Sequence, residues 1–227
     1  MAPRTATVFS LALFPQVFLF ERVLNADVVF VLSDRHLDGH NLANQCVLRS
    51  ASGAMQRIEI PVHRRGVPID EVDVPESATW FPEIEQQVRR IYSGLPMASA
   101  ATGLVSQMLP PNTSPWLTDY LLHPFVVTLR WLGWEKEIVR GATEQRRCYP
   151  VDAEPEYLLD LCLQKGCDRF IVGADAEARY RSLFRHGGVR IISQHWHGSA
   201  DLRARDSILD PVARFSVSDI RGRMQQN

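Results

Sequence analysis

The chain has 227 residues, with 25 basic and 26 acidic residues and a formal charge of −1. Hydrophobic residues make up 45% and charged residues 22%, as in ordinary globular proteins, and the near-zero charge offers no overall attraction for nucleic acid or an anionic membrane. A single α/β domain over residues 1–227 is expected for this length. The four cysteines form no CxxC pair, so reduced thiols and a cytoplasmic location are expected.

Residues 6–20 form an apolar run that is too short and broken for a membrane span. A secretory signal remains an alternative interpretation, but Pro15 and Gln16 interrupt the run and no clean cleavage pattern follows. The run instead divides into a strand at 7–13 and a helix that starts at Phe14-Pro15, where proline suits the first turn. A second strand is expected at 27–33. Together these segments predict a βαβ unit with parallel strands.

The next segments predict an antiparallel hairpin and then a helical insert. Residues 45–50 and 55–62 read as strands around a turn at 51–54, and we expect this pair to be attached to the parallel sheet. Residues 75–134 are punctuated by prolines, with helices expected at 83–94, 98–109 and 116–133. This insert is the natural place for a lid or a partner surface.

The last third returns to an alternation of strands and helices. Strands are expected at 135–141, 168–173 and 189–197, and helices at 154–166 and 176–188. A helix is also expected near the end of the chain. The pattern predicts a mainly parallel sheet with helices on both faces, a Rossmann-like three-layer architecture.

In open parallel sheets the ligand binds beyond the carboxyl ends of the strands. This rule selects residues that follow the expected strands, and we predict that they contact a small-molecule substrate: Phe14, Asp34, His36, His40, Gly173, Asp175, His195 and His197. A histidine at this edge suits general acid–base chemistry, because imidazole titrates near neutral pH.

Other chemistries are less well supported by the sequence. The histidines with Asp34 or Asp38 form a conceivable metal site, although no fixed zinc spacing supports it, and we expect no metal. Cys46, paired with His36 or His40, is a conceivable thiolate nucleophile, but a small buried cysteine is the commoner case. The sequence has no GxSxG, GxxxxGK[ST] or GxGxxG motif, which leaves serine hydrolase, P-loop and dinucleotide readings without support.

Several landmarks resemble the WbqC-like protein family in their order along the chain. The Phe14-Pro15 turn, the strand at 27–33 and Ser33-Asp34 match its opening, where an acidic pair has lost its first member. Further matches are Asn44, IEIPV at 58–62, residues 129–141, FIVG at 170–173 with Tyr180, residues 187–197 and the Phe215–Asp219 stretch.

The chain also departs from this family, and therefore resembles a divergent member. Ser10-Leu11 replaces an opening Gln-Pro pair, and Phe18 replaces a glycine. His36 stands where members carry glutamine, and Leu42 where they carry tryptophan. These differences leave room for another substrate.

The resemblance implies a transferase that adds an acyl or aminoacyl group to a small amine or amino sugar, in surface-glycan or specialised-metabolite biosynthesis. It needs no resident cofactor, but an activated acyl donor such as a thioester, and a carrier protein is a conceivable partner. Carried over by position, Asp34, Asn44, Ser216 and Asp219 belong to the site, and Tyr180 contacts substrate. We predict Asp34 or His36 as the base, Asn44 as a donor to the oxyanion, and Asp219 as an orienting group.

The sequence also allows two functions from other classes. A non-catalytic binding or assembly subunit predicts an exposed apolar patch on residues 97–132. A metal-dependent hydrolase or lyase predicts a metal held by His36, His40 and His195.

Overall fold

A computed structural model describes residues 2–37, 43–108, 114–140, 153–196, 202–203 and 205–224. The chain divides into two compact units. Unit 1 comprises residues 1–10, 19–34 and 136–196, and unit 2 comprises residues 11–18, 35–135 and 197–227. The single domain expected from the length stays a prediction.

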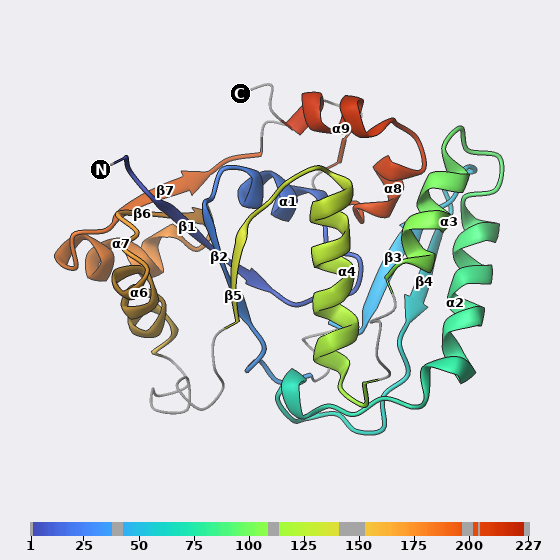
Figure 1. Cartoon of the computed structure of the whole chain (residues 1–227), viewed down its shortest axis with the longest axis horizontal. Helices are drawn as coiled ribbons and strands as arrows, with labels where there is room; N and C mark the ends of the chain where they lie inside the picture. The colour runs from blue at the N-terminus through green and yellow to red at the C-terminus, as the bar shows by residue number, and fades with distance from the viewer. Residues whose placement is uncertain are drawn as a thin grey trace. The chain divides into compact units, whose positions relative to one another are not determined.

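Unit 1 contains a five-stranded parallel sheet with the order β5-β2-β1-β6-β7 (Figure 1). Its strands are β1 (Thr5–Ser10), β2 (Val28–Leu32), β5 (Glu137–Arg140), β6 (Arg169–Gly173) and β7 (Arg190–Gln194). Every pairing is parallel, for example Val8 with Phe30 and Phe170 with Ile191. The structure therefore confirms the predicted α/β class with a mainly parallel sheet.

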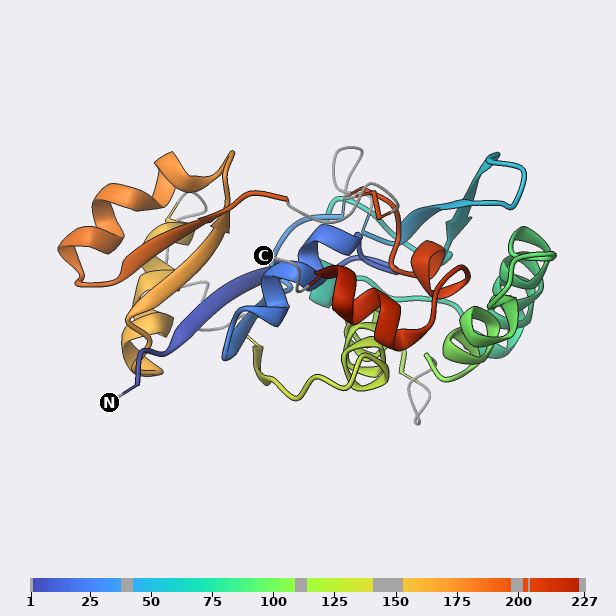
Figure 2. The ribbon, with the colours of Figure 1, turned by 90° about the horizontal axis from the view of Figure 1, so that it is seen from above.

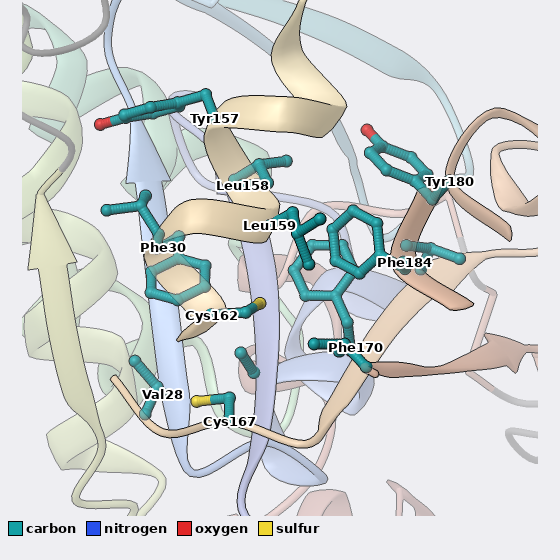
Figure 3. Packing of buried hydrophobic residues seen from close by; sticks show 14 of the residues in the cluster. Val28, Phe30, Tyr157, Leu158, Leu159, Cys162, Cys167, Phe170, Tyr180 and Phe184 are labelled. Carbon is teal, nitrogen blue, oxygen red and sulfur yellow. The ribbon is translucent and has the colours of Figure 1, made fainter. Parts of the chain in front are cut away.

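The apolar core of unit 1 explains this arrangement. All five residues of β2 are buried, as expected for a central strand covered on both faces. On one face, Phe30 and Phe170 pack with α6 (Glu154–Gln164) and α7 (Glu177–His186). Figure 3 shows this packing around Leu158 and Phe184. Side chains that point to the opposite face, including Val29 and Val31, are buried as well.

Helix α1 (Val17–Leu24) follows β1 and begins later than predicted. The helix was expected to start at Phe14-Pro15, but Phe14 has a φ of 44°, in the left-handed region. A left-handed residue cannot continue into a right-handed helix, and a residue before proline is disfavoured in the helical region. The segment thus turns at Phe14 before the helix begins.

Unit 2 contains the predicted hairpin as a separate two-stranded sheet of β3 (Gln45–Arg49) and β4 (Met55–Glu59). The two strands are antiparallel, with Cys46 opposite Ile58. The expectation that the pair is attached to the parallel sheet is wrong, because the described strands place it in a sheet of its own. Leu48 and Ile58 are its buried side chains, so the hairpin has one apolar face.

Three long helices fill the predicted helical region, and α2 and α3 lie side by side (Figures 1 and 2). They are α2 (Ser77–Ile91), α3 (Ala98–Ser106) and α4 (Leu117–Trp131). Helix α2 begins before the predicted start at residue 83 and contains Pro82. Its buried residues Trp80, Ile84 and Val88 repeat every four residues, and this apolar face outweighs the hydrogen bond that Pro82 cannot donate.

Unit 2 also contains the short 3-10 helix η1 (Ile69–Glu71), α8 (Leu209–Val212) and the predicted C-terminal helix, α9 (Val217–Met224). Within the described ranges, none of the helices combines the length and the apolar character that crossing a membrane requires.

Candidate functional site

The carboxyl edge of the parallel sheet is the first candidate site, and it lies in unit 1. Because the strands are parallel, the residues that follow β2, β6 and β7 share one edge, and these include Asp34, Gly173 and His195. The strand order reverses between β1 and β6, since β2 lies on one side of β1 and β6 on the other. Such a reversal is where open α/β sheets bind ligands.

A chain of polar side chains, buried at Glu21 and half-buried at Arg22 and Gln194, reaches this edge from α1. The Nε of Arg22 donates to Oε1 of Gln194 at 3.0 Å, and Nε2 of Gln194 donates to Oε2 of Glu21 at 2.7 Å. Glu21 is only 2% exposed. Burial lowers the pKa of Arg22, and the charge of Asp175 opposes this shift. Arginine nevertheless stays charged at neutral pH, so the edge carries a fixed positive group.

Gly173, the last residue of β6, permits a close approach to this guanidinium. A β-carbon at position 173 would lie 2.7 Å from Oδ1 of Asp175 and 4.0 Å from Nη2 of Arg22. Any larger residue would therefore displace the Asp175 carboxylate. The structure thus brings Gly173 and Asp175 together, and their contact with substrate stays a prediction.

Tyr180 is a core residue rather than an exposed one. Its hydroxyl donates to Oε1 of Glu154 at 2.6 Å, and its ring packs edge-to-face on Phe184 (Figure 3). The side chain is 4% exposed. These contacts explain why Tyr180 is buried in the core, and they give no support to its predicted contact with substrate.

The remaining predicted residues of unit 1 are polar groups at the edge. Asp34 is half-buried and follows Ser33, whose buried hydroxyl has no hydrogen-bond partner among the described residues. His195 is exposed. The pKa of Glu177 is lowered mainly by a hydrogen bond from Arg181, and His195 makes the smallest contribution to this shift. Asp34 and His195 follow strands that are three positions apart, about 14 Å at the usual strand spacing.

Asn44 and His36 lie in unit 2 and have defined contacts. Nδ2 of Asn44 donates to Oε1 of Glu59 at 3.1 Å and to the Ile60 carbonyl at 2.8 Å. Both N–H groups of the amide are thus engaged, which does not fit the predicted role of Asn44 as an oxyanion donor. Its Oδ1 is buried without a described partner. His36 is exposed, and its Nδ1 lies 3.1 Å from the Gly66 carbonyl.

Ser216 and Asp219 form a capping box at the start of α9. The Ser216 hydroxyl donates to Oδ2 of Asp219 at 2.6 Å, and the Asp219 N–H donates back to Oγ of Ser216 at 3.2 Å. The first of these bonds is the main reason that the pKa of Asp219 is lowered. The cap explains both residues, and their role in the site stays a prediction.

Phe14 is buried and borders a narrow apolar cavity of about 20 Å³ in unit 2, together with Trp80 and Tyr120. Left-handed backbone at a residue other than glycine costs about 1–3 kcal/mol and is concentrated at functional sites. The predicted role of Phe14 in binding substrate therefore stays open at this cavity. His40 and His197 lie outside the described residues.

A buried carboxylate that the sequence analysis missed is Asp210 of α8, which is 2% exposed. Its Oδ1 accepts from the Tyr92 hydroxyl at 2.8 Å and from the Arg49 N–H at 2.9 Å, and its Oδ2 has no described partner. Burial raises the pKa of Asp210 to about 6. Burial, and then the charge of Asp210, raises the pKa of Cys46. Cys46 therefore stays a thiol at neutral pH, contrary to the thiolate hypothesis.

The described residues give little support to a metal-dependent enzyme or to a non-catalytic binding subunit. Within the described part of the chain, no group of three metal-ligating side chains is assembled. In the described parts of 97–132, Trp116 is the one strongly exposed large hydrophobic residue, which is no contiguous apolar patch.

The fold defines a mainly parallel α/β protein with polar groups at the carboxyl edge of its sheet. Residues 12–201 match the WbqC-like protein family, and the chain belongs to this family. The Phe215–Asp219 stretch lies beyond the matched range. Comparison with curated proteins and with solved structures gave no match.

Proposed function

We propose that the protein is an acyl or aminoacyl transferase that forms an amide bond between an activated carboxyl group and a small amine. Amino sugars of glycan or specialised-metabolite biosynthesis are the acceptors that its family resemblance favours. The observation that carries the proposal is the Arg22–Gln194–Glu21 chain, in which Gln194 ends β7 and Arg22 lies near Gly173 at the end of β6. It provides a fixed cation at the edge where this class of fold binds ligands.

The proposed reaction starts with a thioester or a similar donor. The amine nitrogen attacks the carbonyl carbon, the carbon–sulfur bond breaks, and the thiol leaves. Arg22 offsets the negative charge that develops on the carbonyl oxygen. The ammonium group first loses one proton to solvent and becomes the free amine. After the attack, Asp34 takes the second proton from the nitrogen, and this proton passes to the leaving thiolate. The step needs neither a metal nor a redox cofactor.

The test is an assay of the purified protein with glucosamine and two donors, the acetyl and glycyl thioesters of N-acetylcysteamine. Thiol release and the mass of the amide product are followed together. We expect protein-dependent amide formation, and a loss of about 100-fold in kcat/KM for Asp34→Asn and Arg22→Gln.

The matched control is Arg190→Gln, which changes an exposed arginine at the amino end of β7 and should leave the rate unchanged. Circular dichroism checks that each variant is folded. Thiol release without an amide product, or equal rates in the Arg22 and Arg190 variants, would contradict the proposal.

A further inference from the structure

An open groove of about 530 Å³ lies within unit 2, between strand β4 with its following loop and helix α2. Arg57 and Glu59 are two residues apart on β4, so their side chains point to the same face of the strand. Trp80 and Glu83 are three residues apart on the helix and share one of its faces. Arg65 completes the polar lining. The volume is in the range of small-molecule sites.

The first pair of charges in the groove is already neutralised. Nη2 of Arg65 donates to Oε1 of Glu59 at 2.6 Å, and the same oxygen accepts from Nδ2 of the buried Asn44 at 3.1 Å. Arg65 and Asn44 thus both hold the Glu59 carboxylate in place. This contact leaves Arg57 on the strand and Glu83 on the helix as the other charges of the lining.

Arg57 and Glu83 have opposite charges and belong to opposite walls. Glu83 accepts a hydrogen bond from the neutral Gln87 amide at 3.1 Å, and no ion pair of Arg57 occurs among the described residues. A ligand that spans the groove is complementary when it carries a carboxylate for Arg57 and an ammonium group for Glu83. These groups define a zwitterion.

Trp80 and Ile84 add a small apolar area to the groove lining, since they are only 7% and 4% exposed. Nε1 of Trp80 donates to the Pro75 carbonyl at 3.0 Å, and its ring packs edge-to-face on Tyr120, with centroids 5.2 Å apart. Trp80 and Ile84 also border the narrow cavity next to Phe14. An apolar side chain of a ligand can therefore lie on a surface that needs no rearrangement.

A second observation beside this groove involves Asn44. The amide is fully buried, and its Oδ1 has no hydrogen-bond partner among the described residues. An unsatisfied buried acceptor is costly. Through its Nδ2, Asn44 holds the Glu59 carboxylate of the groove lining, but it does not itself line the groove.

We propose that this groove binds a hydrophobic α-amino acid as a free zwitterion. Its carboxylate contacts Arg57, its ammonium group contacts Glu83 and its side chain lies on Trp80 and Ile84. The proposal concerns binding alone and does not depend on the transfer reaction.

The test is isothermal titration calorimetry of the full chain with L-phenylalanine and L-leucine, up to about 10 mM. Two analogues each lack one charge: 3-phenylpropionate has no amine, and phenethylamine has no carboxylate. We expect saturable binding of the amino acids, and affinities for both analogues that are lower by at least about tenfold, because each loses a charged hydrogen bond.

Arg57→Gln and Glu83→Gln should each weaken amino-acid binding by about tenfold. Arg89→Gln and Glu76→Gln are matched controls on or beside α2; both side chains are exposed and outside the groove lining, and both variants should bind as the wild type does. No saturable heat with the folded wild type, equal affinity for the analogues, or equal effects of groove and control variants would overturn the proposal. The analogue series decides the question even if a variant fails to fold.

Discussion

The two units hold their buried charged side chains in different ways. In unit 1, the amide of Gln194 links the carboxylate of Glu21 to the guanidinium of Arg22. In unit 2, the carboxylate of Asp210 meets the Tyr92 hydroxyl and a backbone N–H, with no cation in direct contact among the described residues. The guanidinium of the first arrangement stays charged at ordinary pH values, whereas burial raises the pKa of the Asp210 carboxyl to about 6.

The largest expected effect comes from breaking the link in unit 1. Gln194→Leu removes both hydrogen bonds and leaves a buried carboxylate and a guanidinium without their shared partner. We expect the free energy of unfolding to fall by about 4 kcal/mol, measured by urea denaturation. Gln164→Leu, at the exposed end of α6, is the control and should change it by less than about 0.5 kcal/mol. Similar values for the two variants would show that the linked charges contribute little to stability.

Replacing Asp210 is expected to have an intermediate effect on the free energy of unfolding, and this effect depends on pH. The pKa of this carboxyl is about 6 in the folded protein, above its ordinary value of 3.8, so the folded state binds the proton more tightly than the unfolded state does. The stability that this proton provides is present at low pH and is lost as the pH rises through 6. The free energy of unfolding of Asp210→Asn, relative to that of the wild type, should therefore rise by about 2 kcal/mol between pH 4 and pH 7.

The measurement for this comparison is urea denaturation of both proteins at a series of pH values. Tyr92→Phe, which removes the hydroxyl that donates to Asp210, should shift the transition to higher pH. A stability difference between wild type and Asp210→Asn that does not change with pH would contradict a buried carboxyl of raised pKa.

These buried groups show where the sequence stops being informative. Continuous apolar strands and their alternation with helices predicted the parallel sheet, and this order placed Asp34, Gly173 and His195 at one edge. The Glu21–Arg22 pair inside an otherwise apolar helix is the one local signal of the buried network. Its partner Gln194 is 172 positions away from Arg22, and no local pattern indicates such a pairing.

The sheet that the hairpin joins and the residue where α2 starts also depend on contacts that are distant in the sequence. Residues 45–59 show strand patterns, but nothing in them says which sheet they join. Because proline usually begins or ends a helix, the sequence predicts a start of α2 after Pro82, whereas packing of Trp80 and Phe81 extends the helix across this proline. In both cases the contacts that decide the outcome come from other segments.

The smallest effect is expected at the exposed capping box of α9, which contrasts with the two buried sites. Ser216→Ala removes the hydroxyl that caps the helix and bonds to Asp219, and we expect a loss of about 1 kcal/mol in the free energy of unfolding. Amide formation should stay at the wild-type rate. A variant of unchanged stability that has lost activity would instead support the predicted role of Ser216 and Asp219 in the site.

Binding at the carboxyl edge of the parallel sheet is tested most directly by mapping a product onto the ¹⁵N-labelled protein by NMR. N-glycylglucosamine is titrated, and the backbone amide resonances are followed. We predict that the largest shifts occur at Gly173, Asp175 and Gln194. Saturable binding that leaves these three resonances unchanged while others shift would contradict a site at this edge.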